Sequence, residues 1–322
     1  MRGNGRGRRE VWGVVTLLTV LVLAGCGVAV NEDLVATVTP YPVRSPVSAS
    51  PMAGSAEVAA ELTIAAEAAL AIGDLEEADR LLARSLDIYP SQARAYIARA
   101  RLALARAGQV AGVYDAALED LNRALAIDPT SLPAQLGRSA AYSTRATFAG
   151  DPEDWQRALT ALDAVTDQEV PEVAIARASA LIGGGDLAAA RDGLETVPEL
   201  EDPKDRVAFA NAWALLALRM GDWEDARTRA LEALAVDPQN LEAALSLIEA
   251  EIGVDNASAA LVAADELLVR LPDEGRALYW RGRALMALDR PAEARQSLDR
   301  VSMVLDESPV YQARISEAMS NL

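Results

Sequence analysis

The sequence predicts an all-α fold in which helical hairpins stack in a row as an α-solenoid. The first observation is a recurring cassette, whose central alanines follow one another at spacings of 32 to 41 residues. The second is an apolar stripe at helical spacing in every cassette. The third is composition: hydrophobic residues make up 51% of the chain and aromatic residues only 4%. Such small, aliphatic side chains favour closely packed helices over a β-sandwich.

Each cassette reads as the second helix of a hairpin, and its copies share a turn residue with an alanine five residues later. The clearest copies are residues 73–90, 112–129, 221–238 and 289–306, and weaker copies are residues 154–165, 185–197 and 256–272. The shared alanines, called the anchor alanines below, are Ala78, Ala117, Ala158, Ala190, Ala226, Ala260 and Ala294. Because alanine has little side chain, two helices can approach closely at each of these positions.

The helix boundaries are marked by turn chemistry. Gly73, Gly185 and Gly221 can adopt the left-handed conformation that ends a helix, and the aspartate after each can cap the next helix. Prolines then stop the second helix of four cassettes, at Pro90, Pro129, Pro238 and Pro272.

The first helix of each hairpin is also visible as a run of apolar or small residues at three and four spacing. These runs are residues 93–105, 132–145, 173–182, 207–220, 241–252 and 276–288. One hairpin cannot bury its apolar stripe alone, whereas stacked hairpins can. The final segment, residues 308–322, begins with Ser308 as an N-cap and Pro309 at the first helical position, and we expect it to be a capping helix over the last hairpin.

These features resemble the tetratricopeptide repeat (TPR), with its W-x2-L-G-x2-Y, A-x3-F and P pattern over 34 residues. The closest copy has Leu278, Arg281, Gly282 and Leu285 in the first helix and Ala294 in the second. The resemblance implies a right-handed superhelix of about seven hairpins over residues 57–307. The chain departs from the pattern where arginine replaces the first-helix leucine and where two early units are long. Sel1-type or other helical-hairpin solenoids remain the alternative.

The N-terminus has the pattern of an export signal. Four arginines precede an apolar run at residues 11–24, and Leu23-Ala24-Gly25-Cys26 follows. This resembles the lipobox of bacterial lipoproteins, which implies that residues 1–25 are removed and that the Cys26 thiol carries lipid. The alternative is an uncleaved anchor with an incidental cysteine. The expected location is therefore outside the cytoplasm, on a bacterial membrane at the outer face of the cell membrane or the periplasmic side of the envelope.

Between the anchor and the repeats, residues 26–56 are rich in Val, Thr, Ser and Pro and are predicted to be a disordered, lipidated tether. Removal of residues 1–25, which carry four Arg and one Glu, changes the net charge from −18 to −21. Phosphate backbones repel such a surface, so we expect no nucleic-acid partner.

The chain lacks the residue types that several classes of catalytic chemistry require. The chain has no histidine, its single cysteine is the predicted lipid site, and Lys204 is its only lysine. No phosphate-binding loop or G-x-S-x-G motif occurs. A glycosidase needs only two carboxylates, but the Asp and Glu residues are spread over solvated helix faces and caps. We therefore predict no catalytic residues, no metal site and no cofactor, and a protein that is not an enzyme.

The TPR resemblance implies a binding groove lined by one face of each first helix. The groove residues it selects are Arg94, Ile97, Arg101, Leu136, Ile175, Asn211, Leu215, Arg219, Leu245, Glu249, Arg276, Tyr279 and Arg283. Arg94 with Arg101, and Arg276 with Arg283, are seven residues apart, so each pair points the same way. The pairs can hold a carboxylate or an acidic peptide by bidentate hydrogen bonds. The simpler interpretation is that each arginine pairs with a neighbouring Glu or Asp.

These expectations combine into a non-catalytic, membrane-anchored adaptor that binds a protein or peptide of the cell envelope in its groove. Two alternatives stay open. One is an envelope protein that binds or hydrolyses peptidoglycan or another glycan, and the other is a scaffold packed permanently into an oligomer. The sequence does not indicate the oligomeric state.

Overall fold

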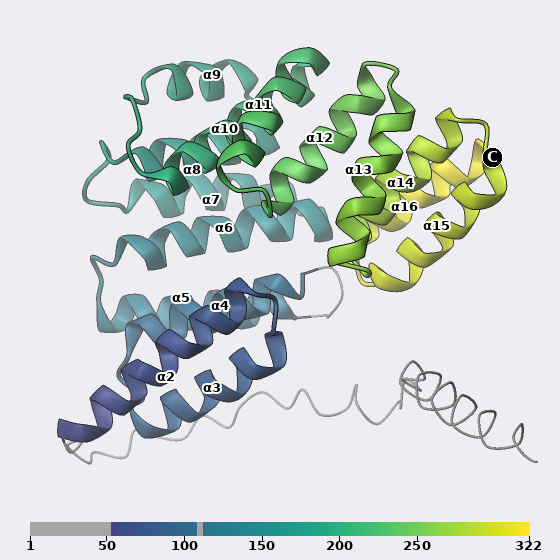
Figure 1. Ribbon diagram of the computed structural model, residues 1–322. Helices are drawn as coiled ribbons and strands as arrows, with labels where there is room; N and C mark the ends of the chain where they lie inside the picture. The colour runs from purple at the N-terminus through teal and green to yellow at the C-terminus, as the bar shows by residue number, and fades with distance from the viewer. Residues whose placement is uncertain (1–52, 108–111) are drawn as a thin grey trace, which may run out of the picture. The chain divides into compact units, whose positions relative to one another are not determined.

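The computed structural model describes residues 53–107 and 112–322 (Figure 1). The predicted signal sequence, the lipid site Cys26 and the tether up to residue 52 lie outside the described residues. Within the described part all regular structure is helical, in fifteen helices labelled α2 to α16. This confirms the predicted all-α class.

Fourteen of these helices form seven hairpins. Their first helices are α2 (Ala53–Ala71), α4 (Ala93–Ala105), α6 (Leu132–Ala149), α8 (Pro171–Gly184), α10 (Pro203–Met220), α12 (Leu241–Gly253) and α14 (Gly275–Ala287). Their second helices are α3 (Leu75–Ile88), α5 (Val113–Ile127), α7 (Glu153–Asp163), α9 (Leu187–Glu195), α11 (Trp223–Val236), α13 (Ala257–Arg270) and α15 (Pro291–Val304). The chain ends with α16 (Pro309–Ser320).

The hairpins stack as nearest neighbours. Each first helix from α2 to α12 packs against its own partner and against the first helix of the next hairpin, while each second helix packs against the first helix that follows it. Among the described residues, no two second helices pack closely against each other. The first helices therefore form a continuous wall, called the inner wall here, and the second helices form an outer layer, as expected for a TPR-like solenoid.

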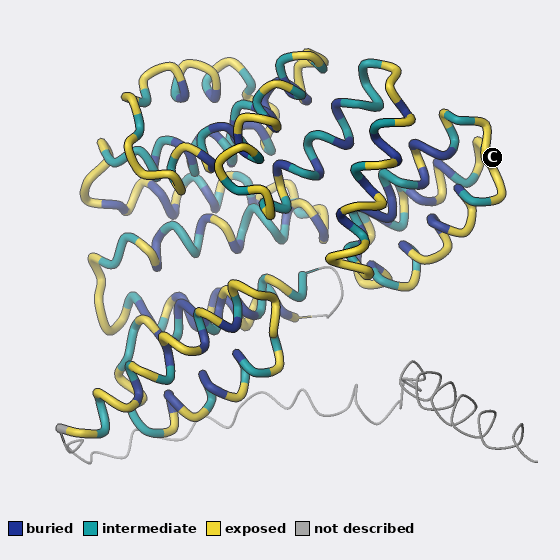
Figure 2. The backbone as a smooth tube through the Cα atoms, viewed as in Figure 1, coloured by how far each residue is buried: buried dark blue, intermediate teal, exposed yellow. Residues whose placement is uncertain are grey.

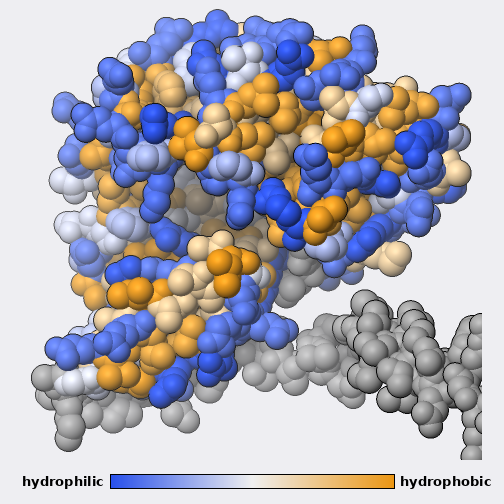
Figure 3. All heavy atoms as spheres, in the orientation of Figure 1, coloured by the Kyte–Doolittle hydropathy of each residue, from blue (hydrophilic) through white to orange (hydrophobic). Residues whose placement is uncertain are grey.

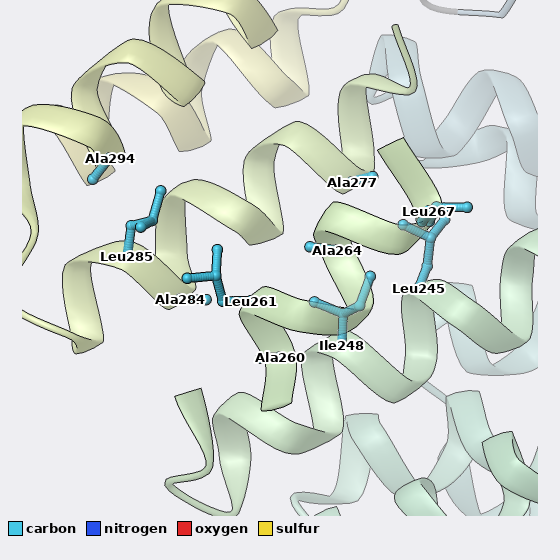
Figure 4. Close-up of a cluster of buried hydrophobic side chains, with 10 residues drawn as sticks. All are labelled: Leu245, Ile248, Ala260, Leu261, Ala264, Leu267, Ala277, Ala284, Leu285 and Ala294. Atoms are coloured by element: carbon cyan, nitrogen blue, oxygen red, sulfur yellow. The ribbon is translucent and has the colours of Figure 1, made fainter. Parts of the chain in front are cut away.

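The anchor alanines explain how closely the helices approach. All seven have an exposed fraction of 0%. Around them, leucine and isoleucine side chains fill the space between successive hairpins. In the last two hairpins, Ile248, Leu267 and Leu285 lie with Ala260 and Ala294 in one apolar cluster (Figure 4). Figure 2 shows buried stretches where helices face their neighbours and exposed stretches on the outward turns.

The hairpin turns follow the predicted capping chemistry in three units. Gly221 has a φ of +77° at the end of α10, and the Asp222 side chain accepts a hydrogen bond from the Asp225 backbone N–H at the start of α11. Asp74 and Asp186 cap α3 and α9 in the same way. The last two hairpins use a different residue at the left-handed position, because Asp255 and Asp289 have φ values of 60° and 55°.

Three arginines that replace the first-helix leucine pair with aspartates of second helices. Arg99 of α4 donates two hydrogen bonds to Asp120 of α5, at 2.6 and 2.7 Å. Arg177 pairs with Asp163 at 2.9 Å, and Arg281 pairs with Asp265 at 2.6 Å. This departure from the repeat pattern therefore joins first helices to second helices by ion pairs.

Two boundaries fall where the sequence pattern was ambiguous. α2 begins at Ala53, so residues 53–56, which were predicted to belong to the tether, are part of the first helix. α6 runs to Ala149 and has 18 residues, like α10, against 13 and 14 in the neighbouring first helices α4 and α8. The long third unit is thus accommodated by extending its first helix.

The final helix α16 begins as its sequence indicates, because the Ser308 side chain accepts a hydrogen bond from the Tyr311 backbone N–H. Its buried residues Tyr311, Ile315 and Ala318 join Leu298, Val301 and Leu305 in one apolar cluster. α16 packs against α15 and also against α6, ten helices earlier in the chain.

Candidate protein-binding surface

All thirteen predicted groove residues lie on helices of the inner wall, but they differ in accessibility. Ile97, Ile175, Leu245 and Tyr279 are buried, with exposed fractions of 5 to 8%. The first three belong to three separate apolar clusters between hairpins, so their side chains pack within the solenoid. Four predicted residues are exposed and five are half-buried: the exposed ones are Arg94, Arg101, Arg219 and Arg283, and the half-buried ones are Leu136, Asn211, Leu215, Glu249 and Arg276.

The two arginines of the predicted pair Arg94 and Arg101 differ in their contacts. Arg94 donates to Glu67 of α2 through two nitrogens, with an Nε to Oε1 distance of 2.9 Å. Arg101, two turns further along α4, has no ion pair among the described residues. The carboxylate of Glu67 therefore already occupies one of the two guanidinium groups that this pair offers.

Arg276 is also occupied within the fold. Its Nη1 donates to both oxygens of Glu242, at 2.8 and 3.0 Å, and its Nε donates to Glu274 at 3.0 Å. Burial by itself lowers the pKa of Arg276, but these two carboxylates more than offset it and hold the pKa above its ordinary value. The guanidinium therefore stabilises the junction of α12 and α14 and has few donors left for a ligand.

The other predicted residues of the last hairpins meet around one glutamate. Glu249 of α12 has a side chain only 21% exposed, and its Oε1 lies 4.0 Å from Nη1 of Arg219. Burial raises the pKa of Glu249 above its usual 4.5, while the positive charges of Arg219, Arg314 and Arg283 oppose that shift. We name Arg219, Glu249, Tyr279, Arg283, Tyr311 and Arg314 the Glu249 cluster.

Aromatic rings support the arginines of this cluster. Arg283 donates from Nη1 to the Tyr279 hydroxyl at 3.1 Å, and its guanidinium carbon lies 6.0 Å from the centre of that ring. Arg314 lies 5.2 Å from the centre of the Tyr311 ring. Among the described residues, Arg283 and Arg314 have no ion-pair partner within 4.0 Å. Three arginines and one carboxylate thus make a locally positive site in an acidic protein.

Sequence reasoning missed two members of the cluster, Tyr311 and Arg314. The C-terminal segment was expected only to be a capping helix over the last hairpin. The available signal was the helical spacing of Tyr311, Ile315 and Ala318, which places Tyr311 on the buried face of α16. Arg314, three residues after Tyr311, then lies near that face.

A separate surface feature lies between α12 and α13. It is a shallow groove of about 440 Å³ lined by Leu247, Ser258, Ala259, Val262 and Ala263, with carboxylates at Glu251 and Glu266. Figure 3 shows apolar side chains interspersed with hydrophilic ones over α11 to α13. The two carboxylates make this groove unsuited to an acidic ligand.

Other kinds of site find no support in the residues described. In ranges 53–107 and 112–322, no three His, Cys, Asp or Glu side chains are grouped so as to hold a metal ion. Over the same ranges, no helix has the length and apolar character needed to cross a bilayer.

Comparison with known proteins supports the repeat assignment. A family model described as tetratricopeptide repeat matches residues 211–253 and 250–302, so the chain contains TPR repeats across α10 to α15. No curated protein sequence matches the chain significantly.

Solved structures share the fold. The chain resembles a tetratricopeptide repeat protein from Parabacteroides merdae, with 15% identity, a TM-score of 0.50, and coverage of 82% of this chain and 98% of the other. It also resembles a chain of the APC/C hetero-tetramer Cut9–Hcn1, with 14% identity and a TM-score of 0.54, covering 89% of this chain and 52% of that one. The fold is therefore a TPR-like solenoid, an architecture whose stacked repeats form extended binding surfaces.

Proposed function

We propose that this protein is a non-catalytic, lipid-anchored adaptor outside the cytoplasm, and that its inner wall binds an acidic segment of a protein partner in the cell envelope. The observation that carries the proposal is the Glu249 cluster, where three arginines surround one half-buried carboxylate. The chain as a whole is strongly acidic, with a formal net charge of −18. An acidic segment is repelled elsewhere on the surface and attracted here.

The chemistry of the cluster suits carboxylates. A guanidinium presents its donors in a planar fork that matches a carboxylate, and the aromatic rings beside Arg283 and Arg314 restrict their positions before a ligand arrives. Because Arg94 and Arg276 are engaged by glutamates, we assign the binding role to Arg219, Arg283 and Arg314 in place of the two pairs expected from spacing.

The binding proposal is tested with the full-length protein in detergent and a fluorescent, glutamate-rich peptide. Fluorescence anisotropy is expected to show saturable binding that weakens as salt is added. A peptide with glutamine in place of glutamate is expected not to bind. Loss of charge-assisted hydrogen bonds costs about 1.5 to 3 kcal/mol each, so Arg283→Ala is expected to weaken binding about tenfold or more.

Arg84→Ala is the matched control for this experiment. Arg84 is exposed on α3 in the outer layer and has no ion pair among the described residues. Its removal changes the net charge by the same amount as Arg283→Ala and is expected to leave binding unchanged. Equal losses in the two variants would show that binding depends only on overall charge, and sedimentation of the protein with purified peptidoglycan would favour the glycan-binding alternative.

The anchor is tested separately at Cys26. We expect metabolic labelling with an alkyne analogue of palmitate to mark the wild type and not Cys26→Ala, because the proposed lipid is attached through this thiol. We also expect the variant to leave the membrane fraction. Labelling of Cys26→Ala, or its retention in washed membranes, would contradict the proposed mode of anchoring.

A further inference from the structure

The solenoid has one contact that breaks its nearest-neighbour pattern. Every other close pair of helices among the described residues is at most two elements apart in the chain, whereas α16 packs against α6. Ser308 donates a hydrogen bond from Oγ to the backbone oxygen of Phe148 at 2.7 Å, across 160 residues of sequence, and both side chains are buried. We call this contact the α6–α16 seam.

The seam is formed by the C-terminal end of α6. Phe148 lies in the last turn of this 18-residue helix and has an exposed fraction of 8%. Just beyond it, Gly150 ends the helix with a φ of +78°, and Val310 approaches so closely that a Cβ at Gly150 would lie 3.1 Å from its Cγ2. The last turn of α6 thus places an aromatic ring against the C-terminal helix.

Aromatic contacts connect the seam to the Glu249 cluster. The Phe148 ring stacks on the Tyr311 ring with their centres 5.7 Å apart. The Tyr311 ring meets Tyr279 edge to face at 5.9 Å, and the Tyr279 hydroxyl accepts the hydrogen bond of Arg283. A chain of contacts therefore runs from α6 through α16 to α14.

We propose that Phe148 is a positioning residue for the Glu249 cluster and acts through Tyr311 of α16. The inference rests on the proposed function of the cluster as an acidic-peptide site. Phe148 does not belong to the cluster, but it covers one face of the Tyr311 ring. Tyr311 and Arg314 belong to α16, a helix of 12 residues whose backbone packs closely against α15 and α6 alone among the described helices, and elements with few packed neighbours open most easily. Contact with Phe148 therefore stabilises the helix that supplies two members of the cluster.

The first experiment measures the seam without a ligand, by hydrogen exchange and mass spectrometry on the full-length protein in detergent. Phe148→Ala is expected to raise the exchange rates of the α16 amides about tenfold or more, because the seam loses its ring stack. Phe209→Ala is the matched control. Phe209 is the chain's other phenylalanine and contacts Trp213 within α10, so its loss is expected to leave α16 unchanged. If α16 exchange is the same in Phe148→Ala as in the wild type, the positioning role is refuted.

The second experiment measures binding of the glutamate-rich peptide. Phe148→Ala is expected to weaken binding about three- to thirtyfold, the range found for substitutions that act through an intervening network. Phe148→Tyr keeps the ring and is expected to restore both affinity and α16 protection. In a double-mutant cycle, Phe148→Ala and Arg283→Ala are expected to be non-additive, whereas Phe209→Ala and Arg283→Ala are expected to add.

The outcomes separate this inference from the proposed function. If the wild type binds the peptide, α16 opens in Phe148→Ala and affinity is unchanged, then Phe148 does not position the cluster although the function stands. If the wild type binds no acidic peptide, the proposed function fails and the assigned role of Phe148 fails with it. An additive cycle between Phe148 and Arg283 would also overturn the inference.

Discussion

Replacement of Gly253 by alanine should destabilise the solenoid even though alanine is the better helix former. Gly253 ends α12, and Trp223 of the preceding second helix packs directly on it. A Cβ at this position would lie closer than 3.0 Å to three atoms of the Trp223 ring. The tryptophan, the glycine or both helices must therefore move.

The size of the effect follows from two opposing quantities. Alanine in place of glycine within a helix gains about 0.5 to 1 kcal/mol, and overpacking of a close contact costs about 1 to 3 kcal/mol. We expect a net loss of about 1 to 2 kcal/mol for Gly253→Ala. Gly193→Ala in α9 is the matched control, because a Cβ there meets no other atom within 4 Å. The control should gain about 0.5 to 1 kcal/mol from helix propensity alone.

Urea unfolding followed by circular dichroism measures both variants against the wild type. Tryptophan fluorescence gives a second signal, to which Trp223 contributes together with the chain's four other tryptophans. Repeat proteins need not unfold in two states, so the two signals should be compared over the whole transition. If Gly253→Ala is as stabilising as Gly193→Ala, the close packing of Trp223 on α12 is wrong.

Two further predictions concern buried carboxylates. Asp154→Asn should cost about 3 to 5 kcal/mol of unfolding free energy near neutral pH, because the fully buried Asp154 side chain forms ion pairs with Arg145 and Arg157. Asp115→Asn is the control, because it removes an 80% exposed partner of the same Arg145, and it should cost less than about 1 kcal/mol. Burial raises the pKa of Asp154, but its hydrogen bonds to the two arginines lower it more, to below 3.8. The stabilisation by the Asp154 carboxylate is therefore present above the pKa of the unfolded state and is lost as pH falls through the pKa of the folded state. Urea titrations in which the difference in unfolding free energy between the wild type and Asp154→Asn does not become smaller in acid would contradict this. The pH dependence expected from Glu249 has the opposite sign, because its pKa in the folded state lies above 4.5. Its contribution to stability is fully present below the pKa of the unfolded state and is lost as pH rises through the pKa of the folded state. Glu249→Gln should therefore be more stable than the wild type near neutral pH and no more stable below roughly pH 4, and equal stability at neutral pH would refute the buried-charge argument.

The repeat architecture was predictable because its determinants are local. Anchor alanines, left-handed turn residues and helix-stopping prolines act within one hairpin and recur along the chain, so each copy supports the others. The seven buried alanines and the aspartate caps of α3, α9 and α11 confirm that this level of the fold is encoded by short-range chemistry.

The candidate site was less predictable because it depends on contacts between distant hairpins. Spacing along a helix showed that Arg276 and Arg283 share a direction, but Glu242, which occupies Arg276, lies on another helix. Nothing local to Phe148 or Tyr311 indicates that the two rings meet. The only sequence signal was the excess length of the third unit, and its consequence depends on the curvature of the whole stack.

The α6–α16 seam also changes how folding can proceed. A linear repeat array can nucleate at any unit and grow outward, because each step closes only a short loop. A contact across 160 residues must wait until the intervening units are ordered, so it raises the mean sequence separation of the contacts and is expected to form late. Removal of α16 would consequently expose the end of α6 in the third hairpin, so a change near the C-terminus would alter packing in a part of the chain that is distant in sequence.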